Sequence, residues 1–187
     1  QLPQPRERER RVINGRYRVY MNYCTVSYTA AWWDWEHWQK ELDFMAMNSV
    51  NMPLFTIGLD AVWYNTLLHF NFSDREARAF LAGPGHAAWQ WMQNLQSYGG
   101  PFPKSVIDRH AALGKKIIAR QLELGMQPIQ QGFSGYVPRE LKDKYPTANI
   151  NQQRSWCGFK GAAQLDPTDS LFTRMGRVFL EEQARLF

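Results

Sequence analysis

Tryptophan side chains in two glycine-containing segments are the residues of this sequence best suited to contact a ligand. Trp89 lies in the glycine- and proline-rich segment 83–103, and Trp156 is followed two positions later by Gly158. Indole faces pack against the apolar faces of sugar rings, and nearby Asn or Gln amides can hydrogen-bond the hydroxyl groups. These residues favour a saccharide ligand, and the alternative is that both indoles belong to the core.

Other residue types offer weaker candidates for chemistry. Cys24 has no sequence-adjacent histidine to activate it, so a small buried hydrophobic residue is a better interpretation than a nucleophile. Asp60 follows a predicted strand, where it either faces a pocket or caps a helix. The two cysteines and four histidines are scattered, which predicts no metal site, and the absence of a glycine-rich phosphate loop predicts no nucleotide cofactor.

The elements that must position these residues alternate between strand and helix. Strands are predicted over 18–24, 51–57 and 126–132, and helices with apolar spacings of three and four lie between them. In parallel α/β folds, ligands bind beyond the carboxyl ends of the strands. The segments that follow the strands are therefore the candidate site: 22–24, 58–60 with 83–103, 130–136 and 155–159.

Helix starts are predicted from capping residues. Asp34 and the Ser73–Glu76 capping box precede two apolar periodic runs, and Ser105 with Asp108 forms a second box. Asp166-Pro167 is expected to begin the last helix, because proline is favoured at the first helical position.

The composition indicates one globular α/β unit. The 187 residues are 44% hydrophobic and 21% charged, which disfavours disorder. The net charge is +5, yet the densest basic run, 6–11, is interleaved with glutamates, so we expect no nucleic acid partner. No apolar run is long enough to span a membrane. Residues 1–16 are expected to be an irregular lead-in to a single domain over 17–187.

Three predicted βα units fit two architectures. A small doubly wound domain can be built from three strands, whereas a (β/α)₈ barrel typically needs about 250 residues, so this chain would supply only part of one.

Collinear motifs extend the argument. They include Tyr20-Met21-Asn22-Tyr23-Cys24, Trp32-Trp33-Asp34-Trp35, Gly83-Pro84 with Trp89, Gly99-Gly100-Pro101 and Ser155-Trp156 with Gly158-Phe159. In these motifs and their order, the sequence from about Arg16 onward resembles the α-N-acetylglucosaminidases of glycoside hydrolase family eighty-nine.

The resemblance implies a retaining exo-glycosidase that removes terminal α-linked N-acetylglucosamine, as in heparan sulfate breakdown. It implies that Asn22, Cys24, Trp89 and Trp156 form the pocket for the terminal sugar, through polar contacts and apolar walls. In the family, both catalytic glutamates come from later strands, and the acid/base lies in a Phe-Asn-Glu motif that these residues lack. We therefore expect a partial (β/α)₈ barrel of about the first three βα units, inactive by itself and part of a longer protein.

The same resemblance implies an N-acetylglucosamine-terminated glycan as partner and a secreted, periplasmic or lysosomal location, and the lack of a long apolar run predicts no membrane partner. The oligomeric state of the longer protein stays open. Arg154 and Cys157 flank Ser155-Trp156 where the family commonly has small residues, so the leaving-group preference also stays open. The competing hypothesis is a non-catalytic sugar-binding or structural α/β domain.

Overall fold

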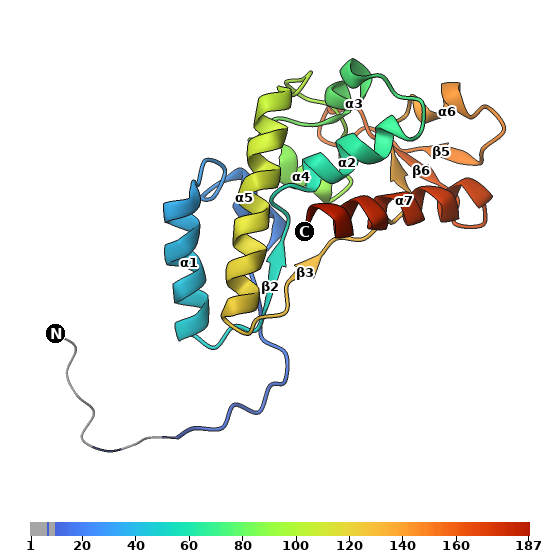
Figure 1. The fold of residues 1–187 in the computed structure, drawn as a ribbon. Helices are drawn as coiled ribbons and strands as arrows, with labels where there is room; N and C mark the ends of the chain where they lie inside the picture. The colour runs from blue at the N-terminus through green and yellow to red at the C-terminus, as the bar shows by residue number, and fades with distance from the viewer. Residues whose placement is uncertain (1–6, 8–9) are drawn as a thin grey trace.

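The computed structural model describes Glu7 and residues 10–187, which form two three-stranded sheets with helices packed against them (Figure 1). The first sheet is parallel, with the order β1 (Val19–Tyr20), β2 (Met52–Phe55) and β3 (Ile129–Gln130). The parallel arrangement expected from the strand-helix alternation is confirmed. Among the described residues the sheet stays open, with β1 and β3 at its edges.

The first strand is shorter than predicted, and the expectation of a strand over 18–24 is wrong beyond Tyr20. Met21 adopts a left-handed backbone with φ of 71°, and a 3-10 helix, η1 (Tyr23–Ser27), follows at once. The Asn22 side chain accepts a hydrogen bond from the Thr25 backbone N–H at 3.2 Å. Because Asn side chains bond local backbone groups in this way, Asn22 begins a helical turn and the strand ends.

Two long helices cover one side of the parallel sheet. α1 (Trp35–Met47) and α5 (Lys104–Glu123) run side by side in Figure 1 and bury Trp38, Leu42 and Ile117 with Phe55 of β2. The predicted cap at Asp34 is confirmed, since its carboxylate accepts from the His37 backbone N–H at 3.0 Å.

A close approach between α5 and β2 depends on Gly114. A Cβ atom at this position would lie 2.5 Å from the Ile57 carbonyl oxygen and 3.1 Å from the Phe55 ring. The missing side chain therefore lets the helix backbone sit directly on the end of the strand.

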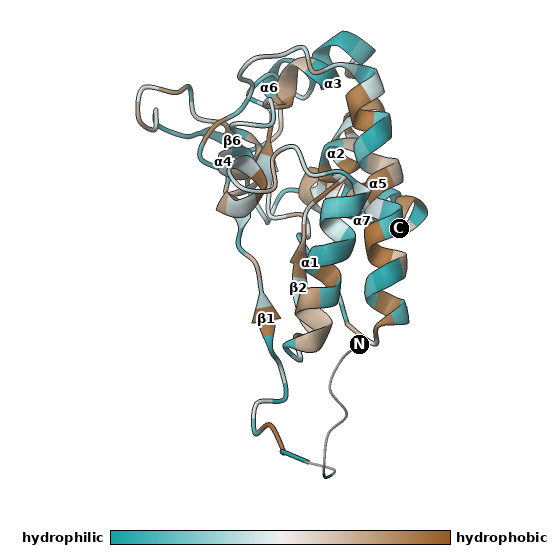
Figure 2. Ribbon diagram, turned by 90° about the vertical axis from the view of Figure 1, so that its left-hand side faces the viewer, coloured by the Kyte–Doolittle hydropathy of each residue, from teal (hydrophilic) through white to brown (hydrophobic). Residues whose placement is uncertain are grey.

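A second, larger core surrounds Trp63 of α2 (Leu59–Leu68). Its indole contacts Phe80 of α3 (Asp74–Phe80) and Phe179 of α7 (Ser170–Leu186), with ring centroids 5.5 and 5.0 Å away. Figure 1 shows α7 lying along α2, and Figure 2 shows apolar residues alternating with polar ones along the surface helices, as expected for helices buried on one face.

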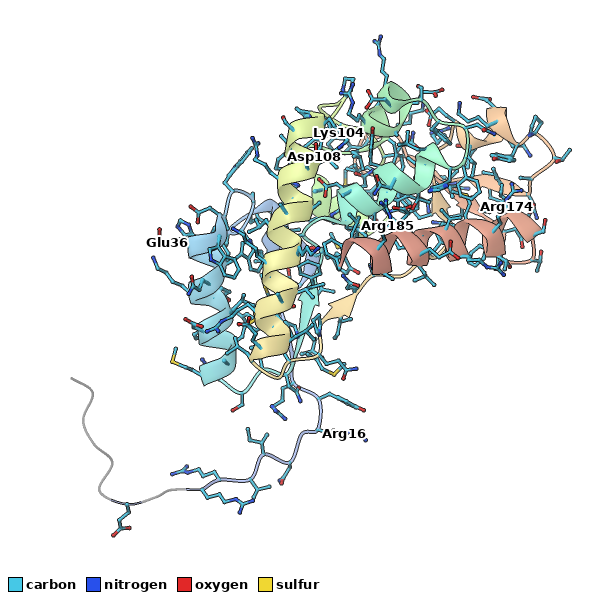
Figure 3. All side chains as sticks on the ribbon, viewed as in Figure 1. Arg16, Glu36, Lys104, Asp108, Arg174 and Arg185 are labelled. Atoms are coloured by element: carbon cyan, nitrogen blue, oxygen red, sulfur yellow. The ribbon has the colours of Figure 1, made fainter. Side chains whose placement is uncertain are left out.

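Two predicted helix starts are wrong. α5 begins at Lys104, after Pro103, and Asp108 forms an ion pair with Lys104 (labelled in Figure 3). α7 begins at Ser170, with Asp169 as its cap, whereas the Asp166 carboxylate accepts from the Thr168 backbone N–H in a turn. The capping box at Ser73, by contrast, is confirmed.

The long connection after β3 contains an antiparallel sheet that the sequence did not predict. Its strands are β4 (Tyr136–Val137), β5 (Ile150–Gln152) and β6 (Ala163–Leu165), in the order β4-β6-β5. The same connection contains the short helix α6 (Leu141–Lys144). Within the part of the chain that the structure describes, no helix is long and apolar enough to cross a membrane.

Candidate functional site

The 3-10 helix η1 places two of the predicted site residues just past the carboxyl end of β1. Asn22 is its N-cap, with its Oδ1 occupied by the Thr25 backbone N–H and hydroxyl, each at 3.2 Å. Its Nδ2 has no hydrogen-bond partner among the described residues. Cys24 is a half-buried free thiol in the same helix. The helix therefore offers an amide donor and a thiol near the edge where parallel sheets bind ligands.

The segment 83–103 is not an irregular loop throughout, because it contains the short helix α4 (Ala87–Trp91). This helix packs against η1, and the Ala88 backbone N–H donates to the buried Ser27 hydroxyl at 2.9 Å. Trp89 lies on α4 and is half-buried. The element that carries Trp89 is thus fixed against the element that carries Asn22 and Cys24.

Trp156 reaches the same place from the far end of the chain. It pairs with Phe159 through backbone hydrogen bonds of 3.0 and 2.8 Å, which close a two-residue hairpin. Cys157 and Gly158 both have positive φ, 48° and 82°, as a tight hairpin turn requires. The Trp156 and Trp89 ring centroids lie 6.4 Å apart.

Trp89 and Trp156 together form an indole wall. Tyr28 extends this wall, because its ring meets Trp89 edge-on at 5.4 Å. The geometry brings Trp89 and Trp156 together, and each keeps part of its surface exposed. Half-exposed indoles in contact suit the apolar face of a saccharide, and Asn22 and Cys24 belong to the helix against which α4 packs.

Buried amide groups hold α4 in position. Gln90 is fully buried, donates to the Phe80 carbonyl at 2.7 Å and accepts from the Ala82 backbone N–H at 2.6 Å. Gln131, just after β3, donates to the Trp91 carbonyl at 2.9 Å. The Gln90 bonds hold α4 against residues 80–82, and the Gln131 bond ties α4 to the carboxyl end of β3. These bonds are not predictable from the sequence, because a glutamine in a short helix gives no sign that it is buried.

Asp60 neither caps α2 nor lies in the indole wall. The cap residue of α2 is Gly58, and the buried Asp60 carboxylate bonds the Nδ1 atom of His110 on α5 at 2.8 Å. Both side chains line a cavity of about 50 Å³ between η1, α4 and α5, together with Thr56 and Trp91. The hydrogen-bonded Asp60–His110 pair therefore links α2 to α5 at this cavity.

Tyr136, the first residue of β4, is also structural. Its hydroxyl donates to the Leu95 carbonyl at 2.9 Å, and burial raises the pKa of Tyr136. It therefore stays neutral in the core.

The segments that form the wall carry no carboxyl groups. The sequences of η1, α4 and the hairpin 156–159 include no Asp or Glu. No cluster of three or more His, Cys, Asp or Glu side chains suited to a metal ion occurs within the described part of the chain. The arrangement can bind and orient a saccharide, and bond cleavage needs carboxyl groups from outside it.

Comparison with known proteins decides the family. A family model for the α-N-acetylglucosaminidase TIM-barrel domain matches residues 16–187. This chain belongs to the α-N-acetylglucosaminidase family. The resemblance inferred from the motifs is therefore confirmed.

Within this family, human α-N-acetylglucosaminidase is 34% identical over 177 residues, which cover 92% of this chain and 24% of the human protein. A Clostridium perfringens family 89 glycoside hydrolase, solved with 2-acetamido-1,2-dideoxynojirmycin, is 38% identical and superposes with a TM-score of 0.87. Another structure of the clostridial protein, with two Glu-to-Gln substitutions, holds its substrate GlcNAc-α-1,4-galactose. This chain spans about a fifth of each clostridial chain.

Proposed function

We propose that residues 17–187 form about the first three βα units of a catalytic (β/α)₈ barrel, with 1–16 as a lead-in. The order β1-β2-β3 follows the chain, as it does in such barrels. Both β1 and β3 have an edge without a strand partner among the described residues, so each can pair with a further strand. The complete protein, as named below, is the polypeptide that contains this chain together with the later strands.

The proposed activity is the removal of terminal α-linked N-acetylglucosamine from glycans, with retention at the anomeric carbon. The contact between Trp89 and Trp156, 6.4 Å apart beside η1, carries this proposal. Two indoles from distant segments form a wall against which a sugar ring can pack. Asn22 and Cys24 would meet its hydroxyl and acetamido groups.

Retaining glycosidases need a nucleophile and an acid/base about 5–5.5 Å apart. Neither resides in the wall, so both would come from later strands of the complete protein. The contribution of this chain is to fix the sugar in place and exclude water, which raises the fraction of bound substrate in a reactive geometry. We accordingly expect these 187 residues to be inactive alone.

The test is to measure turnover of a chromogenic α-N-acetylglucosaminide and of GlcNAc-α-1,4-galactose by the complete protein. NMR should detect α-N-acetylglucosamine as the first product, because two inversions give net retention. A β-product would contradict the retaining mechanism. Binding without turnover would favour the competing function, a non-catalytic sugar-binding domain.

A further inference from the structure

Three aromatic rings form a corner beside the indole wall. The His86 and Tyr98 rings lie 4.1 Å apart, and Phe159 lies 5.0 Å from Tyr98 and 5.7 Å from His86. The planes meet at angles between 54° and 84°, so the rings face one another obliquely. We define these three residues as the aromatic corner.

Backbone hydrogen bonds fix each member of the corner. The Tyr98 carbonyl accepts from Gly83 N–H at 2.9 Å, and the His86 N–H donates to the Gly83 carbonyl at 2.8 Å. Phe159 is held by its two bonds to Trp156 across the hairpin. A corner whose backbone is already fixed loses little conformational entropy when it binds a ligand.

The corner continues the wall outward. Phe159 and Trp156 stack at 6.3 Å with their planes only 28° apart, so the wall and the corner share one hairpin. The Tyr98 residue is 48% exposed, and its hydroxyl has no hydrogen-bond partner in the described structure. An open ring and an unpartnered hydroxyl so close to the wall are suited to a ligand that extends beyond one sugar.

We propose that the aromatic corner binds the leaving-group sugar, the saccharide unit attached to C1 of the terminal N-acetylglucosamine. This inference rests on the proposed function, since it places that terminal sugar against Trp156. The apolar face of the second ring packs on Tyr98 or Phe159, and the Tyr98 hydroxyl hydrogen-bonds its rim. His86 packs against Tyr98 at 4.1 Å and completes the corner.

The test compares two substrates of the complete protein that differ in the leaving group. GlcNAc-α-1,4-galactose has a second sugar, whereas N-acetyl-α-glucosaminyl fluoride has none. For Tyr98→Ala, the ratio of kcat/KM for the disaccharide to kcat/KM for the fluoride should fall about tenfold, because one aromatic contact to the second sugar is lost. Phe159→Ala should shift the ratio in the same direction, and Tyr98→Phe should shift it less.

Tyr17→Ala is the matched control. Tyr17 is 58% exposed and precedes β1, so it lies at the amino end of the strand, whereas the wall lies beyond the carboxyl end. Its replacement should therefore leave the ratio unchanged. An unchanged ratio in Tyr98→Ala and Phe159→Ala would overturn the inference and leave the proposed function standing. Equal losses on both substrates, in step with a lower melting temperature, would also overturn it and make the corner a packing feature. No turnover of either substrate by the unaltered protein would overturn the proposed function, and this inference with it.

Discussion

Replacing Trp156 with alanine tests whether the indole wall contacts the substrate. Trp156 is half-buried, and its rings contact Trp89 at 6.4 Å and Phe159 at 6.3 Å. An indole that covers about 100 Å² of sugar surface contributes about 2.5 kcal/mol at roughly 25 cal/mol per Å². We therefore expect kcat/KM of the complete protein to fall roughly 10²-fold in Trp156→Ala.

The same substitution also removes two ring pairs, which together stabilise the hairpin by about 1–3 kcal/mol. The assay must separate this effect from loss of the wall. Trp156→Phe retains an aromatic ring, so a melting curve like that of the unaltered protein with a strongly reduced kcat/KM would support the wall. Trp32→Ala is the control, because Trp32 is 82% exposed and lies outside the wall.

Activity lost only in proportion to the folded fraction would refute the argument, since it would make Trp156 a structural residue. A large loss in Trp32→Ala would refute it differently, by showing that removal of any surface indole inactivates the protein.

Three further predictions concern the support of the site, and urea unfolding of the complete protein checks each of them. Gln90→Leu leaves the buried Ala82 N–H unpaired and removes one of the two hydrogen bonds to the Phe80 carbonyl, which still accepts from Ser97 N–H, so it should lower the free energy of unfolding by about 1–3 kcal/mol; a change below about 0.5 kcal/mol would contradict the buried amide contacts. Gly114→Val should lower the free energy of unfolding by more than about 2 kcal/mol, because the valine side chain would meet the Ile57 carbonyl. The control Ala112→Val, at an exposed position of the same helix, should lower it by less than about 1 kcal/mol. Hydrogen bonds from the Ser73 backbone, Lys144 and the Ser73 hydroxyl lower the pKa of Glu76 to about 2, below its ordinary value of 4.5. Its folded-state pKa is depressed, so its stabilising contribution should be complete above about pH 5 and should disappear as the pH falls toward about 2. Glu76→Gln should remove that part of the pH dependence, and an unchanged pH profile would contradict it.

Local rules explain what the sequence predicted of the fold. Asp34 and Ser73 cap helices through bonds to backbone groups three residues away, so their roles are visible without tertiary structure. The parallel order of β1, β2 and β3 follows from the alternation of strands with helices.

The errors come from competing local bonds and from long-range pairing. Asn22 ends β1 by capping η1, although the Tyr- and Val-rich run around it is typical of a strand. Asp166 and Asp169 are both residue types that cap helices. In the structure Asp169 is the cap of α7, because its carboxylate accepts from the Leu171 N–H. The antiparallel sheet has strands of two or three residues, too short to give a periodic signal.

In the candidate site, too, local features are predictable from the sequence and long-range contacts are not. Trp89 and Trp156 are predictable site residues because each lies near glycine in a connecting segment, and the structure places them in contact. The contributions of Tyr28, His86 and Phe159 were not predictable, because they depend on how the hairpin 156–159 meets α4 and the segment that ends at Tyr98. Whether the wall binds sugar stays a prediction.

The most direct test of that prediction is a crystal structure of the complete protein with 2-acetamido-1,2-dideoxynojirmycin, the compound held by the clostridial relative. Our account predicts that the sugar-like ring lies within about 4 Å of the Trp89 and Trp156 indoles, the distance of apolar contact, with the Asn22 amide hydrogen-bonded to it. A compound bound at another edge of the sheet, or one that touches neither indole, would contradict the assignment of this chain as the sugar-binding wall.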